Sequence, residues 1–374
     1  MKNFWEELKS LEAGSLERRE FIKKNYYANY SKIGVRLQYI NELVQAREYE
    51  LAKQLCVGVD INEKNKSWAL PWFNKICDEI KENIISSGVA SKKYLTKDKP
   101  DFLCIGAQKA GTSWLYANLN RNGNIWMPPI KELHYFDHLF CPANRKWTTW
   151  HIQKSAKIIL EKKQDYKSNI NNDYINYIEK ISNGTLFCEE WYKDIFNYYA
   201  DPSCVYGDIT PEYSTIPEDG IRYIKKYLNS PKIIYIIRDP FLRVISQVKM
   251  NALRQQFPLD ADENKWKTLL SEQSLQSRGD YKKFIPLWNK TFPESSILYM
   301  PFGLIAQDST KFIQTVEDFL GVGHIDESEI IREKVWGSKE YIIPESILDY
   351  LYALIFEQYD FLKQNFTKEF IELI

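Results

Sequence analysis

The sequence has no excess of charge of either sign. Its 374 residues include 50 Lys and Arg against 50 Asp and Glu, so the formal net charge at pH 7 is zero. A polybasic nucleic-acid binder needs a surplus of cations to neutralise phosphates, so that class is excluded and no nucleic-acid partner is expected. The 44% hydrophobic and 27% charged residues are ordinary globular proportions, which also exclude a disordered or collagen-like chain.

Long apolar segments are missing as well. The sequence contains no run of about 18 apolar residues, the length of a membrane-spanning helix, so no membrane partner is expected. Near the amino terminus, Glu6 and Glu7 stand where a secretory signal peptide requires an apolar stretch. These absences predict a soluble, cytoplasmic protein.

Metal-ligand spacings are absent too. The six cysteines form no CxxC pair, which is typical of free thiols in a reducing compartment. His138, His151 and His324 are scattered along the chain and offer no recognisable ligand set. No metal ion is therefore expected.

Residues 1–98 are expected to form a helical N-terminal extension. The segment 35–44 places its apolar side chains close to one helical face, and Pro71 is expected to begin another helix that ends near residue 85. This region carries no catalytic motif. A solvated appendage is one interpretation, and a homodimer interface or a lid over the substrate is another.

Residues 99–374 show a different pattern, which follows the polar linker 97–100. Short apolar runs alternate with helical patterns, which predicts an α/β domain built on a mostly parallel sheet flanked by helices. The expected strands are residues 102–106, 204–209, 232–237 and 297–300. Residues from about 138 to 203 are polar and irregular, and they are interpreted as an insertion that frames the acceptor site.

The first motif runs from strand through loop to helix over residues 106–115. Its glycines, Gly106 and Gly111, have the spacing of an ATP-binding loop, in which backbone N–H groups and a helix N-terminus hold phosphate. Thr112, however, stands where such a loop needs its lysine, and the one lysine is Lys109. The loop therefore suits a nucleotide phosphate without the machinery for a γ-phosphate and Mg²⁺. A plain strand–helix turn is the alternative.

The second motif also follows a strand. Arg238 stands at the strand end and Ser246 lies two helical turns further on, where open α/β sheets bind ligands. Both side chains are placed to reach one phosphate, and Arg is the residue best matched to bidentate phosphate contact. The alternative pairs Arg238 with a local carboxylate and leaves Ser246 solvated.

The third motif is residues 129–137, where Glu132, His134 and Asp137 lie close together in sequence. A carboxylate beside a histidine is the usual material for proton abstraction. A structural, hydrogen-bonded histidine is the alternative.

Taken together, these motifs resemble those of the sulfotransferases that use 3′-phosphoadenosine 5′-phosphosulfate (PAPS), over residues 101–366. The segment 131–137 is similar to the K-E-x-H-[FY]-F-D motif of the heparan-type and related bacterial branch. The resemblance implies a P-loop-like central parallel sheet flanked by helices. It also implies a PAPS donor, with adenosine 3′,5′-bisphosphate as the product and no metal cofactor.

The resemblance also implies roles for individual residues. The donor's phosphosulfate would be bound by the loop residues Lys109, Ala110, Gly111, Thr112, Ser113 and Trp114. Arg238 and Ser246 would bind the 3′-phosphate, and Lys339 would lie in a basic loop over the donor. Glu132 would be the catalytic base, with Lys109 and His134 as further catalytic residues. The acceptor would be contacted by Tyr135, Phe136 and Asp137.

Two further segments are similar to elements of that family. In residues 207–213, Asp208 replaces the family's glutamate and Ile209 replaces a lysine of the heparan branch, which argues against a polyanionic glycan acceptor. Residues 277–281 are similar to its R-G-x-Y element, with an expected role in cleft structure.

The predicted function is therefore transfer of a sulfuryl group from PAPS to a hydroxyl or amine of a small metabolite or natural product. Two alternatives stay open: a P-loop kinase or NTPase, and a catalytically silent nucleotide-binding module. If Glu132 is not the base, His134 is the next candidate. A dinucleotide dehydrogenase is excluded, because the segment 321–323 lacks the third glycine and the strand–helix context.

Overall fold

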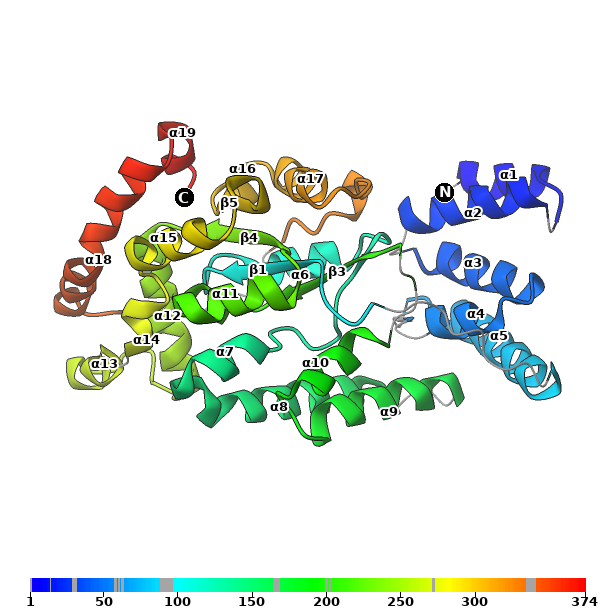
Figure 1. Ribbon diagram of the computed structural model, residues 1–374, viewed down its shortest axis with the longest axis horizontal. Coiled ribbons are helices and arrows are strands. Elements are labelled where there is room, and N and C mark those ends of the chain that lie inside the picture. The colour runs from blue at the N-terminus through cyan, green and yellow to red at the C-terminus, as the bar shows by residue number, and fades with distance from the viewer. Residues whose placement is uncertain are drawn as a thin grey trace.

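The structure is a computed structural model, and it is shown as a ribbon in Figure 1. It describes residues 2–13, 15–28, 32–56, 59, 61, 64–87, 97–163, 169–198, 201, 203–270, 273–333 and 341–374. Among these residues, no helix is both long and apolar enough to cross a bilayer.

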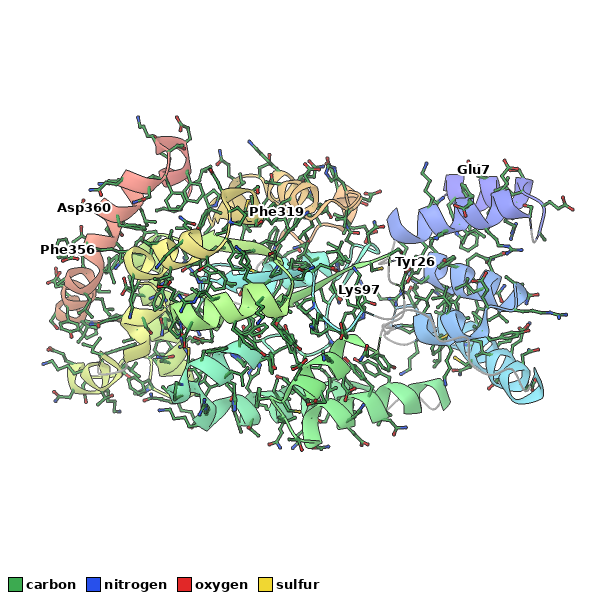
Figure 2. All side chains as sticks on the ribbon, viewed as in Figure 1. Glu7, Tyr26, Lys97, Phe319, Phe356 and Asp360 are labelled. Carbon is green, nitrogen blue, oxygen red and sulfur yellow. The ribbon has the colours of Figure 1, made fainter. Side chains whose placement is uncertain are left out.

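In the part of the chain that the structure describes, five helices precede the first strand and lie beside the rest of the molecule (Figure 1). They are α1 (Lys2–Ser10), α2 (Leu16–Ala28), α3 (Ile33–Gln45), α4 (Tyr49–Cys56) and α5 (Lys66–Ser87). Helix α3 packs against α2, α4 and α5, and its Leu37 and Ile40 are fully buried. Tyr26 of α2, labelled in Figure 2, is also buried against the ring of Tyr39, with centroids 4.6 Å apart. The expected extension is therefore helical, and its buried side chains belong to the same hydrophobic cluster as those around the sheet.

One expected boundary in this region is wrong. Pro71 does not begin a helix but lies inside α5, which starts five residues earlier at Lys66. A proline within a helix removes one backbone hydrogen bond. Burial of the neighbouring Ala69 and Phe73 holds α5 in place across that position.

The second part of the chain is built on a five-stranded parallel sheet with the order β2-β3-β1-β4-β5. The strands are β1 (Phe102–Gly106), β2 (Ile125–Trp126), β3 (Val205–Ile209), β4 (Lys232–Ile237) and β5 (Ile297–Pro301). Every residue of β1 is buried, as expected for a central strand covered on both faces. The four expected strands are confirmed, and the two-residue β2 was not predicted.

Helices cover the sheet on both sides, with α16 and α17 above it and α7 and α11 below it in Figure 1. The helices that follow the strands are α6 (Thr112–Leu119), α11 (Glu218–Tyr227), α12 (Pro240–Arg254), α13 (Glu263–Leu270), α14 (Gln273–Ser277), α15 (Tyr281–Thr291), α16 (Leu304–Gln307), α17 (Ser309–Leu320), α18 (Glu345–Asn365) and α19 (Lys368–Ile371). Short 3₁₀ turns are η2 (Pro211–Thr215), η3 (Glu294–Ser296) and η4 (Glu327–Glu329). Parallel strands with helical crossovers confirm the predicted α/β architecture.

The insertion at 138–203 is helical rather than irregular, so that part of the prediction is wrong. It contains the end of α7 (Tyr135–Phe140), η1 (Pro142–Asn144), α8 (Arg145–Lys163), α9 (Asn169–Asn183) and α10 (Glu189–Phe196). Aromatic packing explains the helices despite the polar composition: Trp191 and Tyr192 of α10 are buried, and the Trp191 indole donates to the Ile181 carbonyl at 2.8 Å.

Candidate functional site

The first motif forms a tight loop between the carboxyl end of β1 and the start of α6. Lys109 and Gly111 both adopt left-handed backbone angles, with φ of 70° and 83°. A Cβ atom at Gly111 would lie 2.6 Å from Cδ1 of Ile305, so only glycine fits there without a shift. Gly111 is also the N-cap of α6 and supplies no side-chain cap. The first-turn N–H groups of a helix lack intrahelical partners, so this end is suited to an anion.

Arg238 reaches this loop from the end of the neighbouring strand β4. Its Nη1 donates to the Lys109 carbonyl at 2.6 Å, and its guanidinium lies 4.4 Å from the ring centre of Phe302. The Nε atom is buried without a hydrogen-bond partner among the described residues. The adjacent Asp239 is engaged elsewhere, because its Oδ1 caps α12 and its Oδ2 accepts from Tyr359. Arg238 is therefore not paired with a local carboxylate in the described part of the chain, contrary to the alternative interpretation.

The electrostatics of the loop favour a bound anion. Burial, together with the charges of Arg238 and Arg254, lowers the pKa of Lys109. Burial likewise lowers the pKa of Arg238. No carboxylate lies within 4.0 Å of either cation in the part of the chain that the structure describes. The exposed Arg254 was not a predicted site residue, because its position at the far end of α12 gave no sequence signal.

A buried network holds the loop against two other segments. Arg278 Nε donates to Glu212 Oε2 at 2.8 Å, and its Nη1 donates to Gln108 Oε1 at 3.2 Å. Gln108 Nε2 in turn donates to Glu212 Oε1 at 3.1 Å. Tyr281, from the same R-G-x-Y segment as Arg278, donates its hydroxyl to the Arg238 carbonyl at 3.1 Å. Residues 277–281 thus support both cationic residues from behind, which matches their expected role in cleft structure.

Glu132 and His134 lie in a strained segment that precedes α7. Both have left-handed backbone angles, with φ of 64° and 55°, and the Glu132 N–H donates to the carbonyl of Ile209 at the end of β3 at 3.2 Å. The Glu132 side chain is 31% exposed. Its Oε1 accepts from Lys131, and its Oε2 lies 3.7 Å from Nε2 of His134.

His134 stands between two carboxylates. Its Nδ1 lies 3.1 Å from Oδ1 of Asp137, and Asn144 donates to Oδ2 of the same carboxylate at 2.8 Å. Burial by itself lowers the pKa of His134, but Asp137 and Glu132 outweigh it and raise that pKa to about 10. Burial by itself raises the pKa of Glu132, but Lys131 and His134 outweigh it and hold that pKa well below its usual range. At neutral pH, Glu132 is therefore ionised and His134 is protonated.

Helix α8 adds a residue that the sequence analysis set aside. His151 meets His134 edge to face, with ring centroids 4.8 Å apart, and its Nε2 lies 3.1 Å from the Lys131 carbonyl. Trp147, one turn earlier on α8, stands 4.6 Å from the His134 ring centre. The interpretation of His151 as scattered was wrong, because the insertion folds as helices and returns this face to the motif. An i, i+4 aromatic–histidine pair on one helix was the only available signal.

The two halves of the site meet electrostatically. The negative charge of Glu132 raises the pKa of Lys109, although burial lowers that pKa by more. The structure thus brings together the predicted residues Lys109, Arg238, Glu132 and His134. Ser246 is half-buried on α12, in the helix that Arg238 precedes. Lys339 lies outside the described residues.

Several other predicted residues play structural parts. Ala110 and Thr112 are buried and Ser113 is half-buried in the loop and its helix. The Trp114 indole points into the core, where it donates to the Ile331 carbonyl at 2.6 Å and packs on Phe312, so only its backbone is left for a donor.

Tyr135, Phe136 and Asp137 are almost completely buried, with exposed fractions of 2%, 0% and 0%. The Tyr135 ring stacks on Tyr192 at 4.3 Å, Phe136 packs against the same ring, and Asp137 orients His134. The expected contact of these three side chains with an acceptor is therefore corrected to support of the site from behind.

Asp208 is also buried, where a glutamate stands in the family motif. Its carboxylate accepts from the hydroxyls of Tyr192, Tyr213 and Thr210 at 3.0, 2.8 and 2.7 Å. Burial raises its pKa to about 6, although these three donors oppose the shift. Asp208 therefore joins β3 to the aromatic packing under Glu132 and His134.

Three solved structures are similar to this chain. The solved sulfotransferase of Alicyclobacillus acidocaldarius aligns over 73% of this chain and 98% of its own, with 17% identity and a TM-score of 0.48. The sulfotransferase domain of the Synechococcus PCC 7002 olefin synthase aligns over 67% of this chain and 83% of its own, with 16% identity and a TM-score of 0.42. The sulfotransferase domain from the curacin biosynthetic pathway aligns over 70% of this chain and 98% of its own, with 12% identity and a TM-score of 0.43.

A search of curated proteins finds no significant match to this sequence. A model of the sulfotransferase family, in contrast, matches residues 100–326. That match spans more than half of the 374 residues and contains the loop, Glu132, His134 and Arg238. The chain therefore belongs to the sulfotransferase family.

Proposed function

We propose that the protein transfers a sulfuryl group from PAPS to a hydroxyl or amine of a small acceptor, with Glu132 as the general base. The single observation that carries this proposal is the placement of an ionised, partly exposed carboxylate within electrostatic reach of Lys109. Membership of the sulfotransferase family supports the type of reaction.

The loop and Arg238 are suited to hold the donor. PAPS supplies an activated sulfuryl group on a phosphate leaving group. Lys109 and the first-turn N–H groups of α6 are placed to neutralise the charge that grows on the departing phosphate oxygen. Arg238 and Ser246 are assigned to the 3′-phosphate, a group that ATP lacks. Among the described residues, neither cation is paired with a carboxylate. This supports the assignment, because a partly buried cation without a counterion favours an anionic ligand.

Glu132 is suited to take the proton. As the acceptor atom forms its bond to sulfur and the sulfur–oxygen bond to the phosphate breaks, the acceptor's proton becomes strongly acidic. Even a carboxylate of low pKa then accepts it, so the lowering by Lys131 and His134 does not disqualify Glu132. Those same neighbours keep Glu132 ionised before the transfer, as a base must be.

His134 is the weaker candidate for the base. Its pKa of about 10 means that it already carries its proton at neutral pH. Its Nδ1 is also committed to Asp137. We therefore assign His134 to positioning and charge balance beside Glu132, and the acceptor is proposed to be a small cytoplasmic metabolite or natural product.

A thermal-shift comparison tests the donor. Adenosine 3′,5′-bisphosphate and Mg·ATP are added separately to the purified protein, since a ligand stabilises the folded state by about 2.7 kcal/mol at about a hundred times its dissociation constant. Stabilisation by the bisphosphate alone is expected. Stabilisation by Mg·ATP alone would replace this proposal with a kinase or NTPase.

A second measurement separates an enzyme from a silent binding module. Hydrolysis or transfer of labelled sulfate from PAPS, followed with a panel of small hydroxyl and amine acceptors, is expected with the wild-type chain. If the wild-type chain binds the bisphosphate but shows no turnover with any acceptor of the panel, and so behaves like Glu132→Gln, the silent module would be favoured.

A further inference from the structure

We propose that Glu132, His134 and His151 form a binding site for a divalent transition metal ion with the ligand preferences of zinc. Each residue offers one ligand atom, and these atoms all lie within 4.8 Å of one another. Two imidazoles and one carboxylate are a donor set that suits Zn²⁺. This set comes from two segments that are separated by the whole of α7 and η1.

The separations are close to those that a zinc ion requires. Bonds of about 2.0–2.1 Å in a tetrahedral arrangement put the ligand atoms about 3.4 Å apart. The Oε2 of Glu132 and the Nε2 of His134 are already 3.7 Å apart. His134 is fixed by its surroundings, whereas Glu132 and His151 are partly exposed, so their side chains are the ones free to close the remaining distance.

His134 provides a second, independent sign of a ligand. Its side chain is 1% exposed, and its Nε2 has no hydrogen-bond partner among the described residues. A buried polar atom left without a hydrogen bond destabilises the folded protein. Its other nitrogen lies 3.1 Å from Asp137, which Asn144 holds in turn. A carboxylate on Nδ1 is the support that metal-bound histidines usually have, and it leaves Nε2 for the ion.

His151 is oriented in a comparable way. Its Nε2 lies 3.1 Å from the Lys131 carbonyl, an acceptor, so Nε2 carries the proton and Nδ1 keeps its lone pair. The Trp147 and His134 rings stand 4.6 Å apart, and His151 meets His134 at 90°. Helix α8 therefore places the His151 ring beside that of His134, with one ligand atom of each inside the 4.8 Å span of the cluster.

Lys131 does not close the site. It donates to Oε1 of Glu132 and leaves Oε2, the oxygen nearer His134, available. The ion would displace the proton of His134, as metals do when they bind ionisable ligands. Three protein ligands beside a partly exposed carboxylate leave a fourth position open, as in zinc sites that bind a further ligand.

Metal binding has a consequence that rests on the proposed function. The ion would take the Oε2 of Glu132, the atom on the side of His134, and would compete with the proton of the acceptor. Zn²⁺ at micromolar concentrations is then expected to inhibit sulfuryl transfer without weakening bisphosphate binding.

The test uses the full chain after treatment with a chelator. Co²⁺ is titrated by absorption spectroscopy and Zn²⁺ by competition with a chelating dye. One ion per chain is expected, with nitrogen and oxygen ligands in the cobalt spectrum. His151→Ala is expected to weaken the affinity by at least about 100-fold, because it removes a ligand, whereas loss of a supporting partner such as Asp137 costs about 10–100-fold. His324→Ala, at an exposed histidine paired with Asp318, is the matched control and is expected to bind normally.

Three results would overturn the site. The first is an equal metal affinity in His151→Ala and wild type. The second is metal binding no stronger than that of a histidine-free reference protein. The third is a thiolate charge-transfer band, which would assign the ion to one of the six cysteines. Circular dichroism confirms that the variants are folded. The metal site stands, and the base assignment fails, if metal binds through His151 without inhibiting transfer. The base assignment stands, and the metal site fails, if Glu132→Gln is inactive and no metal binds.

Discussion

Two halves of the candidate site balance their charges in different ways. Around Lys109 and Arg238, no carboxylate lies within 4.0 Å in the described part of the chain, and the Nε of Arg238 has no partner. Around Glu132 and His134, each charge has an oppositely charged neighbour within 4.0 Å. The first half, called the donor half because the donor is proposed to bind there, lacks a counterion among the described residues. The second, the base half, is balanced in the resting protein.

This difference predicts different effects of mutation. Changes in the donor half should alter nucleotide affinity, because the phosphates of the proposed donor would supply the counterion. Changes in the base half should alter the rate of transfer rather than nucleotide affinity. The charges of Glu132 and His134 are balanced by other side chains of the protein and not by the donor.

The largest expected effect is that of Glu132→Gln. The amide keeps the size of the side chain but cannot accept a proton, so kcat should fall by about 10²–10⁴-fold. The dissociation constant of the bisphosphate, measured by calorimetry, should change less than about threefold. Glu179→Gln, at an exposed residue of α9, is the control. Normal turnover of the Glu132 variant would remove it as the base.

Arg238→Ala should come next, and its effect should fall on affinity. Loss of charge-assisted hydrogen bonds worth about 1.5–3 kcal/mol weakens bisphosphate binding by roughly 10–150-fold. The dissociation constant of Arg238→Lys should lie between those of Arg238→Ala and the wild type, since lysine keeps the charge but not the bidentate geometry. Arg222→Ala, at an exposed position of α11, should bind normally. An unchanged dissociation constant for Arg238→Ala would contradict the assigned 3′-phosphate site.

The third prediction compares Gly111→Ala with Gly321→Ala and concerns stability. Both glycines have positive φ, 83° and 77°, so both variants should lose about 1–2 kcal/mol to backbone strain. Only Gly111 is crowded, by Ile305 at 2.6 Å, whereas the nearest atom to a Cβ at Gly321 is 3.9 Å away. Denaturant unfolding should therefore show the larger loss for Gly111→Ala, together with weaker bisphosphate binding. Equal losses of unfolding free energy in the two variants would mean that the loop and Ile305 move apart without a measurable cost.

The last prediction concerns the pH dependence of stability. The pKa of His134 is about 10 in the folded protein, above its ordinary value of 6.5. The stability from this group is fully present below pH 6.5 and is lost as the pH rises towards 10, because the folded state binds more protons in that window.

His134→Asn tests this effect, since asparagine tolerates the left-handed backbone of that position. The decline in unfolding free energy between pH 6.5 and 9.5 should be shallower than in wild type, by at most about 1.4 kcal/mol per pH unit. His324→Asn, at an exposed histidine, should follow wild type. A parallel decline in all three proteins would show that His134 is not stabilised as an imidazolium.

The donor half was largely predictable because its groups are local in sequence. The loop of residues 106–115 is one continuous strand–turn–helix, and its glycine spacing defines its backbone. Arg238 required one further step: β1 and β4 are buried strands, and the carboxyl ends of parallel neighbours meet at one edge of a sheet. The short apolar runs that formed β1 and β4 contained that information.

The base half was only partly predictable. Glu132 and His134 were identified from their motif, but Tyr135 and Phe136 were assigned to the wrong side. An alternation of polar and aromatic residues does not say which face meets the core, and here Tyr192 from the insertion covers both rings. His151 was missed because the polar composition of α8 hid a helix.

The sequence by itself determined the alternation of strands and helices, the glycine loop between β1 and α6, Arg238 at a strand end, and the base candidate. These features depend on contacts between residues near in the chain or on the general rules of parallel sheets. Only the tertiary structure decided that α8 returns to the motif, that His151 faces His134, and that the expected acceptor contacts are buried. Those outcomes depend on how helices pack, and packing is set by the shape of side chains that are distant in sequence.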